Sequence, residues 1–274
     1  MVDVFGSVPF GGSQVTVVLD GKGLANEEML RIARFMSGSV TTFLLSPKLD
    51  SSDYRVRFFT PASELSLAGH PSLGACHAWL STGGVQRHPN QIVQECRAGL
   101  VRLRRTSDGL AFAAPPIKRN EPVDEELLGH IASLLKISMS DIRDARRVNN
   151  GREWVIALLH DSDAVLRLRP SNNIDINLGV AGSFRAGSPD AFEVRTFVPQ
   201  SGMTAEKPVS GLLNAALACW LIHAEHLHAS FTVSQGTAIG RAGRIYISKD
   251  PDGVIWVAGN TSTRMSGEIR QLPR

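Results

Sequence analysis

Cysteine is scarce in this chain, and its three residues occur singly. Cys76, Cys96 and Cys219 are an odd number without paired spacing, so we expect neither a disulfide framework nor a zinc site. Residues 1–6 lack the basic and apolar regions of a signal peptide. Both observations favour a reducing, cytoplasmic location.

Long apolar runs and a strong charge excess are also missing. The longest apolar run, residues 212–222, is about half of the roughly 20 residues that span a bilayer, so we expect no membrane segment. With 29 basic and 26 acidic residues, the net charge of +3 is too mild to predict a nucleic-acid partner. No metal-ligand spacing or glycine-rich phosphate motif occurs, and we therefore expect no metal or organic cofactor.

What the chain does have is 43% apolar residues among 274, enough for a sizeable core. Strands are predicted at residues 15–19, 41–45, 54–59, 92–96, 100–104, 110–113, 154–159, 192–197, 231–233, 245–248 and 254–258. Helices are predicted at residues 27–36, with Asn26 as N-cap, and at 71–81, 125–135 and 210–228. Residues 115–120, which contain Pro115-Pro116, are predicted to be a linker.

The two halves of the chain share a pattern. Phe58-Phe59-Thr60-Pro61 precedes Gly69-His70-Pro71, and Thr196-Phe197-Val198-Pro199 precedes Glu206-Lys207-Pro208. In each case a strand ending in Phe-x-Pro leads through a loop to a predicted helix start, where proline is well tolerated. This internal repeat predicts two similar α/β (α+β) domains, residues 1–116 and 117–274, and it places His70 and Lys207 at equivalent positions.

Several strings in the chain resemble one family. Val2-Asp3-Val4-Phe5, Thr60-Pro61-Ala62 with Ala68-Gly69-His70-Pro71, and Gln235-Gly236 are similar to strings of the PhzF-like proteins of phenazine biosynthesis, within the diaminopimelate epimerase superfold. The resemblance covers the whole chain. It implies two pseudo-symmetric domains, each a curved, mostly antiparallel sheet around a central helix. It also implies a ligand cleft between the domains, a homodimer, and no cofactor.

The two repeated helix starts are the candidate site. Helix N-termini offer unpaired N–H groups and partial positive charge, which suit a carboxylate or an enolate oxygen. We expect His70 to transfer a proton and Lys207 to bind or polarise a carboxylate, although a lone histidine is more often structural and a lysine more often solvated. The predicted substrate-binding residues are Val40, Thr41, Gly69, Ser210, Gly211 and Leu212.

Other reactive side chains near these segments have competing interpretations. Glu64 and Glu206 are either bases or structural groups, and a structural role is favoured for Glu64. Cys76 and Cys219 do not match each other in the repeat and are interpreted as core residues.

The resemblance fails at the residues that carry the family's chemistry. The family's proton-carrying glutamate lies in a Ser-Glu-Thr-Thr-Phe context, where this chain has Val40. The family's aspartate and serine in the second half correspond to Lys207 and Leu212, and its early Gly-Asn reads Gly12-Ser13. A pocket changed in this way is more apolar and more positive. It suits a small substrate with one carboxylate and an apolar body.

Two classes of function fit these residues. The first is a cofactor-independent isomerase that acts on a small carboxylic acid of specialised metabolism by a proton shift or double-bond migration. The alternative is a non-catalytic protein that binds a metabolite, or that stabilises an active paralogue by heterodimerisation, after loss of the acid–base residues.

Overall fold

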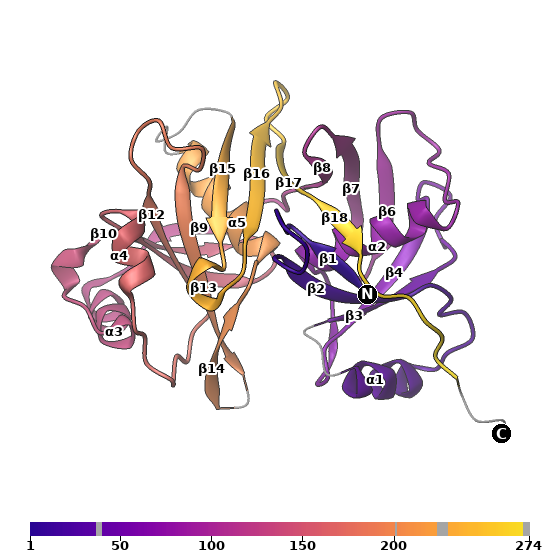
Figure 1. The fold of residues 1–274 in the computed structure, drawn as a ribbon, viewed down its shortest axis with the longest axis horizontal. Coiled ribbons are helices and arrows are strands. Elements are labelled where there is room, and N and C mark those ends of the chain that lie inside the picture. Colours follow the sequence, from indigo (N-terminus) through magenta and orange to yellow (C-terminus); the bar gives the residue numbers. More distant parts are fainter. Residues whose placement is uncertain (37–39, 201, 224–229, 271–274) are drawn as a thin grey trace.

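The computed structural model describes residues 1–36, 40–200, 202–223 and 230–270, which form two similar halves side by side (Figure 1). The first half contains β1 (Val2–Val4), β2 (Ser13–Val18), α1 (Asn26–Phe35), β3 (Thr41–Leu45), β4 (Tyr54–Phe59), β5 (Glu64–Leu65), α2 (Gly69–Ser81), β6 (Ile92–Cys96), β7 (Gly99–Thr106) and β8 (Gly109–Ala113). The remainder contains β9 (Arg119–Pro122), α3 (Glu125–Leu135), β10 (Ile142–Asn149), β11 (Glu153–Leu159), α4 (Ser162–Arg167), β12 (Leu178–Ser183), β13 (Phe192–Gln200), β14 (Met203–Lys207), α5 (Gly211–His223), β15 (Ser230–Gln235), β16 (Gly243–Lys249), β17 (Ile255–Gly259) and β18 (Thr261–Thr263).

The same order of strand pairings occurs in both halves. In the first, β2–β3 and β4–β6 are parallel, and β3–β4, β4–β5, β6–β7 and β7–β8 are antiparallel. In the second, β11–β12 and β13–β15 are parallel, and β12–β13, β13–β14, β15–β16 and β16–β17 are antiparallel. The predicted pseudo-symmetric, mostly antiparallel fold is confirmed.

A helix lies at the centre of each half. The helix α5 is apolar on all sides and its residues 211–222 are buried, as expected of a helix enclosed by a sheet. The helix α2 lies so close to β2 that a Cβ added at Gly74 would be 2.2 Å from Cγ1 of Val15. Leu73 of α2 and Leu213 of α5 belong to one hydrophobic cluster, so the two central helices share a core. By contrast, α1 is amphipathic and packs on the outer face of the first sheet (Figure 1).

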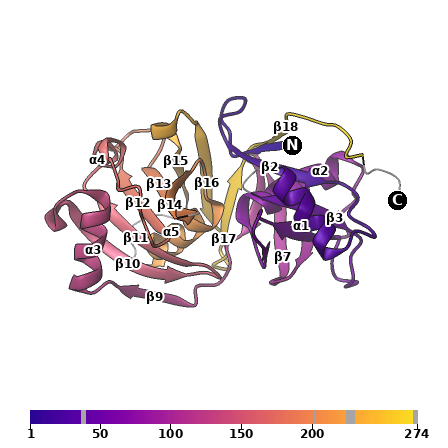
Figure 2. The same ribbon diagram turned by 90° about the horizontal axis from the view of Figure 1, so that it is seen from below.

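The last strands of the chain return to the first half. The strand β17 pairs with β8, and β18 pairs with β1. Figure 2 shows β17 between the two halves. These pairings join the halves through backbone hydrogen bonds, and the division after residue 116 stays a prediction. No helix among the described residues has the length and apolarity needed to cross a membrane.

Most predicted elements are present, with corrections at their ends. The bounds of β3, β4, β6 and α3 coincide with the prediction. Asn26 is the first residue of α1 and not its N-cap; Ala25 is the N-cap residue, and its N–H donates a 2.8 Å hydrogen bond to Oε2 of Glu28. The predicted linker is shorter than expected, since residues 119–120 pair with β10. The predicted helix at 210–228 begins at Gly211, and residues 224–228 lie outside the described residues.

Candidate functional site

The N-termini of the two central helices meet. A Cβ added at Gly69 would lie 3.0 Å from the backbone nitrogen of Leu212 and 3.2 Å from Gly211. One added at Gly211 would lie 3.3 Å from the backbone nitrogen of His70. First-turn N–H groups have no carbonyl partner within their own helix. The contact therefore gathers the N–H groups of four residues, Gly69, His70, Gly211 and Leu212, where both helix dipoles are positive.

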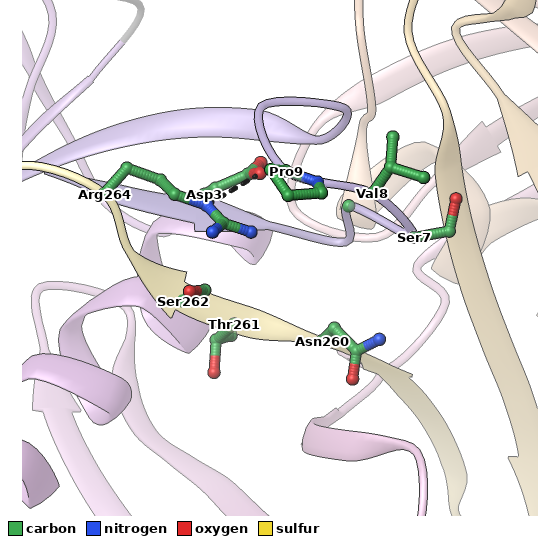
Figure 3. A pocket seen from close by; sticks show the side chains of 9 residues that line it. Asp3, Ser7, Val8, Pro9, Asn260, Thr261, Ser262 and Arg264 are labelled. Carbon is green, nitrogen blue, oxygen red and sulfur yellow. Dashed lines mark ion pairs between the residues drawn. The ribbon is translucent and has the colours of Figure 1, made fainter.

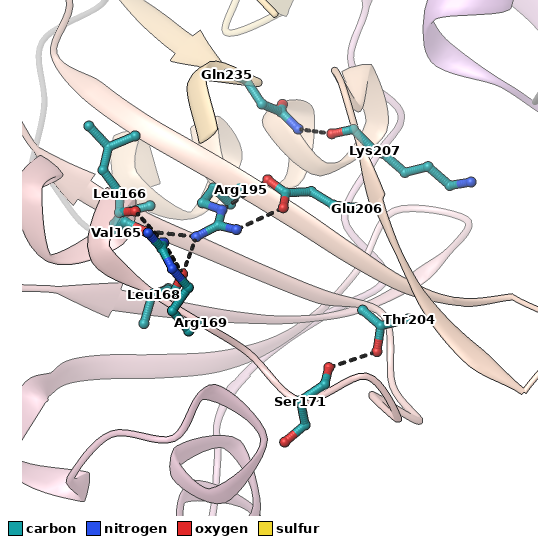
Figure 4. Close-up of polar contacts among 10 residues, drawn as sticks. All are labelled: Val165, Leu166, Leu168, Arg169, Ser171, Arg195, Thr204, Glu206, Lys207 and Gln235. Atoms are coloured by element: carbon teal, nitrogen blue, oxygen red, sulfur yellow. Dashed lines mark hydrogen bonds and ion pairs between the residues drawn. The ribbon is translucent and has the colours of Figure 1, made fainter. Parts of the chain in front are cut away.

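A buried glutamine holds the start of α5. The Gln235 side-chain oxygen accepts hydrogen bonds from the Ser210 N–H (3.2 Å) and from Nδ2 of Asn214 (2.7 Å). Its amide nitrogen donates to Oγ1 of Thr196 (2.8 Å) and to the carbonyl of Lys207 (3.3 Å; Figure 4). Gln235 is fully buried, and its hydrogen bonds connect the end of β14 to the start of α5. The sequence did not predict this positioning role. There, Gln235 appears only in the string Gln235-Gly236 that resembles the family.

His70 is the second residue of α2, and its buried Nε2 atom has no hydrogen-bond partner among the residues that the structure describes. Burial, and to a smaller extent the positive charge of Lys207, lowers the pKa of His70 to about 4. The imidazole is therefore neutral at pH 7, as expected beside a helix N-terminus. A neutral ring with a free nitrogen can accept a proton, or donate one hydrogen bond, at the point where the helix starts meet.

Lys207 is the last residue of β14 and lies opposite Thr196 of β13. Its Nζ atom donates a 2.8 Å hydrogen bond to the side-chain oxygen of Gln200. Burial lowers the pKa of Lys207, and the neighbouring charge of Arg152 lowers it as well. Within the described part of the chain, no carboxylate forms an ion pair with this amine.

The predicted equivalence of His70 and Lys207 is wrong. Glu64 lies opposite Phe59 and Glu206 lies opposite Phe197, and five residues after each glutamate a central helix begins, at Gly69 and Gly211. His70 is thus equivalent to Leu212, and Lys207 to Leu65. Phe197 and Glu206 are nine positions apart and Phe59 and Glu64 only five, because the β13–β14 ladder has longer strands, so matching the prolines shifted the alignment. Pro208 precedes α5 instead of lying in its first turn.

The structure places Val40 and Thr41 on different faces of the first sheet. Val40 and Leu44 belong to the central cluster together with Leu212, whereas Phe43 packs towards α1. Because side chains alternate along a strand, Thr41 points with Phe43 away from the central helices. The expectation that Thr41 lines the site with Val40 is therefore corrected. Thr42 faces inward, and its buried Oγ1 atom finds no hydrogen-bond partner in the described part of the chain.

Both candidate glutamates are held by arginines. Glu64 accepts two 2.8 Å hydrogen bonds from Arg57, which lowers the pKa of Glu64. Glu206 accepts bonds of 2.9 and 2.7 Å from Arg195, which also donates to two carbonyls of the α4 segment (Figure 4). These paired carboxylates have structural roles, because both oxygens of each accept hydrogen bonds from an arginine. The two pairs occupy the same place in each half.

The cysteines are core residues, as predicted. Burial raises the pKa of Cys76 to about 12 and that of Cys219 to about 11, so neither thiol ionises near neutral pH. Among the described residues, no three His, Cys, Asp or Glu side chains gather as metal ligands.

A pocket of about 230 Å³ lies away from the predicted residues, between the loop after β1 and strand β18 (Figure 3). Asp3 and Arg264 form an ion pair there, 3.6 Å from Oδ2 to Nε. The second oxygen of Asp3 accepts a 2.9 Å hydrogen bond from the Gly12 N–H. A Cβ at Gly12 would lie 2.1 Å from the Val4 carbonyl oxygen, so no residue larger than glycine fits at this position. With its carboxylate engaged in this way, the pocket offers no free proton-transfer group comparable to His70.

The family of the chain is decided by comparison with known proteins. A family model described as phenazine biosynthesis-like protein matches residues 2–268. The chain belongs to this family. Trans-2,3-dihydro-3-hydroxyanthranilate isomerase of Pseudomonas aeruginosa is 31% identical, over 97% of each chain. A Schizosaccharomyces pombe protein named antisense-enhancing sequence 1 is 32% identical, over 97% of this chain and 96% of its own.

Solved structures agree with this membership. A Bacillus anthracis phenazine biosynthesis protein of the PhzF family superposes with a TM-score of 0.78 at 25% identity, over 95% of this chain and 94% of its own. A probable proline racemase from Agrobacterium radiobacter shares the fold alone, with a TM-score of 0.64 at 13% identity over 99% and 92%. The chain is thus a PhzF-family protein with an epimerase-like fold.

The neutral state of His70 has a measurable effect on stability. The pKa of His70 is about 4 in the folded chain, compared with about 6.5 unfolded. Between these values the unfolded chain binds more protons, so the free energy of unfolding falls as pH falls from 6.5 to 4. We expect His70 to contribute about 3 kcal/mol to this fall. Urea unfolding across that range should show a shallower fall in His70→Asn, and equal slopes would contradict the assignment.

Proposed function

We propose that this chain is an isomerase of the PhzF type that shifts a proton on a small carboxylic acid without a metal or organic cofactor. The observation that carries the proposal is the buried Nε2 of His70, which no described residue hydrogen-bonds, at the point where the two central helix starts meet. We infer further that the protein acts in the cytoplasm, in specialised metabolism, as a homodimer.

The substrate carboxylate would bind at the helix starts. Each hydrogen bond from an N–H group to an anion contributes about 1.5–3 kcal/mol, and the charge of Lys207 adds attraction. The same N–H groups would stabilise the negative charge that develops on oxygen as a neighbouring carbon loses its proton. Binding of the anion would raise the pKa of His70 from about 4, making it a better base at the moment of transfer.

The remainder of the substrate would be apolar. Val40 and Leu212 belong to the central hydrophobic cluster. A Cβ at Gly211 would lie 3.2 Å from the ring of Phe112. These neighbours favour a hydrocarbon or ring body over a second charged group.

With Val40 in place of the family's glutamate, His70 would both remove and return the proton. Valine cannot transfer a proton, so a shift that needs a carboxylate at this position is excluded. This substitution is also the observation that favours the alternative, a protein that binds the same kind of acid without turnover or stabilises an active paralogue.

Measuring proton transfer to the substrate distinguishes the isomerase from the binding protein. Small carboxylic acids, including trans-2,3-dihydro-3-hydroxyanthranilate, should be incubated with the protein in D₂O and followed by NMR. If the protein is an isomerase, deuterium is incorporated into at least one of these acids. The His70→Asn variant should incorporate none. Acids that bind with neither deuterium exchange nor rearrangement would support the binding protein.

Replacing Val40 with glutamate tests whether the site has a new role or has decayed. We expect Val40→Glu to give no gain in the native activity and weaker binding of the acid, because a carboxylate would enter an apolar cluster beside the bound anion. Calorimetric titration and initial rates measure both. If the parent is inactive on every acid, while Val40→Glu with Lys207→Asp isomerises trans-2,3-dihydro-3-hydroxyanthranilate, the decayed-site interpretation is right.

A further inference from the structure

We propose that the pocket between the loop after β1 and strand β18 is a second ligand site, which binds a small free α-amino acid in its zwitterionic form. The ammonium group of the ligand would bind Asp3 and its carboxylate would bind Arg264, the two charged residues that line the pocket. This site takes no part in proton transfer at the helix starts, so the inference does not depend on the proposed isomerase.

The carboxylate of Asp3 is buried and held in place. Its side chain is only 7% exposed, and Oδ1 accepts the 2.9 Å hydrogen bond from the Gly12 N–H. Asp3 lies opposite Ser262 in the β1–β18 ladder, so the two side chains share one face of the sheet. Among the described residues, Oδ2 of Asp3 has no hydrogen-bond partner. A buried carboxylate oxygen without a donor is costly, and an N–H group of a ligand would satisfy it.

Arg264 supplies the opposite charge and is held less firmly. Its Nε atom lies 3.6 Å from Oδ2 of Asp3, which is too long for a hydrogen bond. Nε has no hydrogen-bond partner within the described ranges, and the guanidinium carbon lies 5.5 Å from the ring centre of Phe10. The side chain is 27% exposed and follows the last strand of the chain. A rotation of this arginine would admit a charged group between it and Asp3 (Figure 3).

The charges of the pocket favour a zwitterion. Asp3 and Arg264 are one acid and one base, and the other lining residues carry no charge. A simple carboxylate would bring a second negative charge close to Asp3, and a simple amine would bring a second positive charge close to Arg264. An α-amino acid carries both charges at pH 7, on neighbouring groups. It would replace one long ion pair with two hydrogen bonds between charged groups.

The size and polarity of the pocket favour a short side chain on the ligand. Its volume of about 230 Å³ is smaller than the roughly 300–1,000 Å³ of pockets for drug-sized molecules. Asn260 and Ser262 also line it, and their amide and hydroxyl groups can form further hydrogen bonds. The hydroxyl of Thr261 is instead engaged by Nδ1 of His77, at 3.0 Å. These neighbours suit glycine, alanine or serine better than a large apolar amino acid.

A bound amino acid would also fix the loop that joins the two halves. Residues 6–9 line the pocket, and the same loop bonds to Ala242 of the second half, through the Ser7 N–H (2.9 Å) and the Gly11 carbonyl (2.8 Å). Phe5 and Phe10 have φ of 69° and 62°, left-handed values that residues other than glycine seldom adopt. A ligand that binds this folded arrangement raises the stability of the protein, so unfolding measures binding as well.

Titration with L-alanine tests the site, with propionate and ethylamine as matched ligands that each lack one charge. Backbone amide signals of the ¹⁵N-labelled protein are followed by NMR at pH 7. Only those of Gly6, Gly12 and Ser262 are read, because the helix starts are proposed to bind carboxylates too. We expect L-alanine to shift these signals to saturation, and each analogue to need at least about tenfold more, since it loses one charged hydrogen bond. L-Alanine should also raise the midpoint of urea unfolding.

Two variants distinguish recognition of the ligand from a structural role. Asp3→Asn keeps an oxygen for the Gly12 N–H but removes the negative charge. It should bind L-alanine about tenfold or more weakly, and propionate more tightly than the wild type does. Arg264→Met should also lose L-alanine, and should bind ethylamine at least as tightly as before. The control is Arg270→Met, which removes an exposed arginine of the same segment and should leave all three affinities unchanged.

Three results would overturn the inference. The first is the absence of any shift at the pocket signals with L-alanine. The second is equal binding of L-alanine, propionate and glycerol there, which would indicate a polar pocket that does not recognise charge. The third is unchanged L-alanine binding in both Asp3→Asn and Arg264→Met.

Discussion

Replacing His70 with asparagine should lower turnover by about 10²–10⁴-fold, the usual contribution of a positioned acid–base group. Asparagine is polar and similar in size, but it cannot carry a proton. The affinity for the acid should change only a few-fold, because the carboxylate is held by N–H groups of the backbone. Initial rates and calorimetric titration on one acid separate the two effects.

The matched control is His77→Gln on the same helix. The ring nitrogens of His77 are occupied by hydrogen bonds to Thr261 and Thr263, each 3.0 Å long. Turnover should survive this change. Equal losses in the two variants would mean that the helix is disturbed generally. An effect of His70→Asn on affinity alone would favour the binding protein.

Replacing Glu206 with glutamine should lower the free energy of unfolding by about 3–5 kcal/mol, the usual cost of removing one partner from a buried ion pair. Its partner Arg195 has a side chain only 6% exposed, so the uncompensated charge cannot reach water. The equivalent Arg57 is 25% exposed, and Glu64→Gln should therefore cost less. Urea unfolding of both variants gives the comparison.

A double replacement sharpens this test. Exchanging Arg195 for Met and Glu206 for Leu removes both charges together, so the protein should recover part of the stability lost in Glu206→Gln. A double variant less stable than the single one, or an equal loss in Glu64→Gln, would show that the buried charge is not the cause.

The fold could be predicted well wherever the side-chain pattern reflects burial. Strands such as β3 and β4 carry apolar and aromatic runs, and their bounds were predicted correctly. The strand β10 was missed because its sequence, Ile-Arg-Asp-Ala-Arg-Arg-Val-Asn, is mostly polar and forms through pairing with β9 and β11. Strand β18, only three residues long, likewise depends on its partner β1. Such segments depend on contacts distant in sequence.

The candidate site was predicted in part. A helix start at His70 follows from the local sequence, and its contact with the start of α5 follows from the repeat. The roles of Gln235 and Arg152 could not be predicted, because each depends on strands that meet only in the folded chain. The equivalence of His70 and Lys207 failed because the strands of the β13–β14 hairpin are longer than those of the β4–β5 hairpin, which an alignment that matches prolines does not show.

Locating the bound carboxylate tests the central claim most directly. Backbone amide resonances of the ¹⁵N-labelled protein should be followed by NMR during titration with phenylpyruvate. The account predicts that the N–H signals of Gly69, His70, Gly211 and Leu212 shift together and saturate at one concentration. Shifts confined to the pocket around Asp3 and Arg264, with the helix starts unchanged, would contradict it.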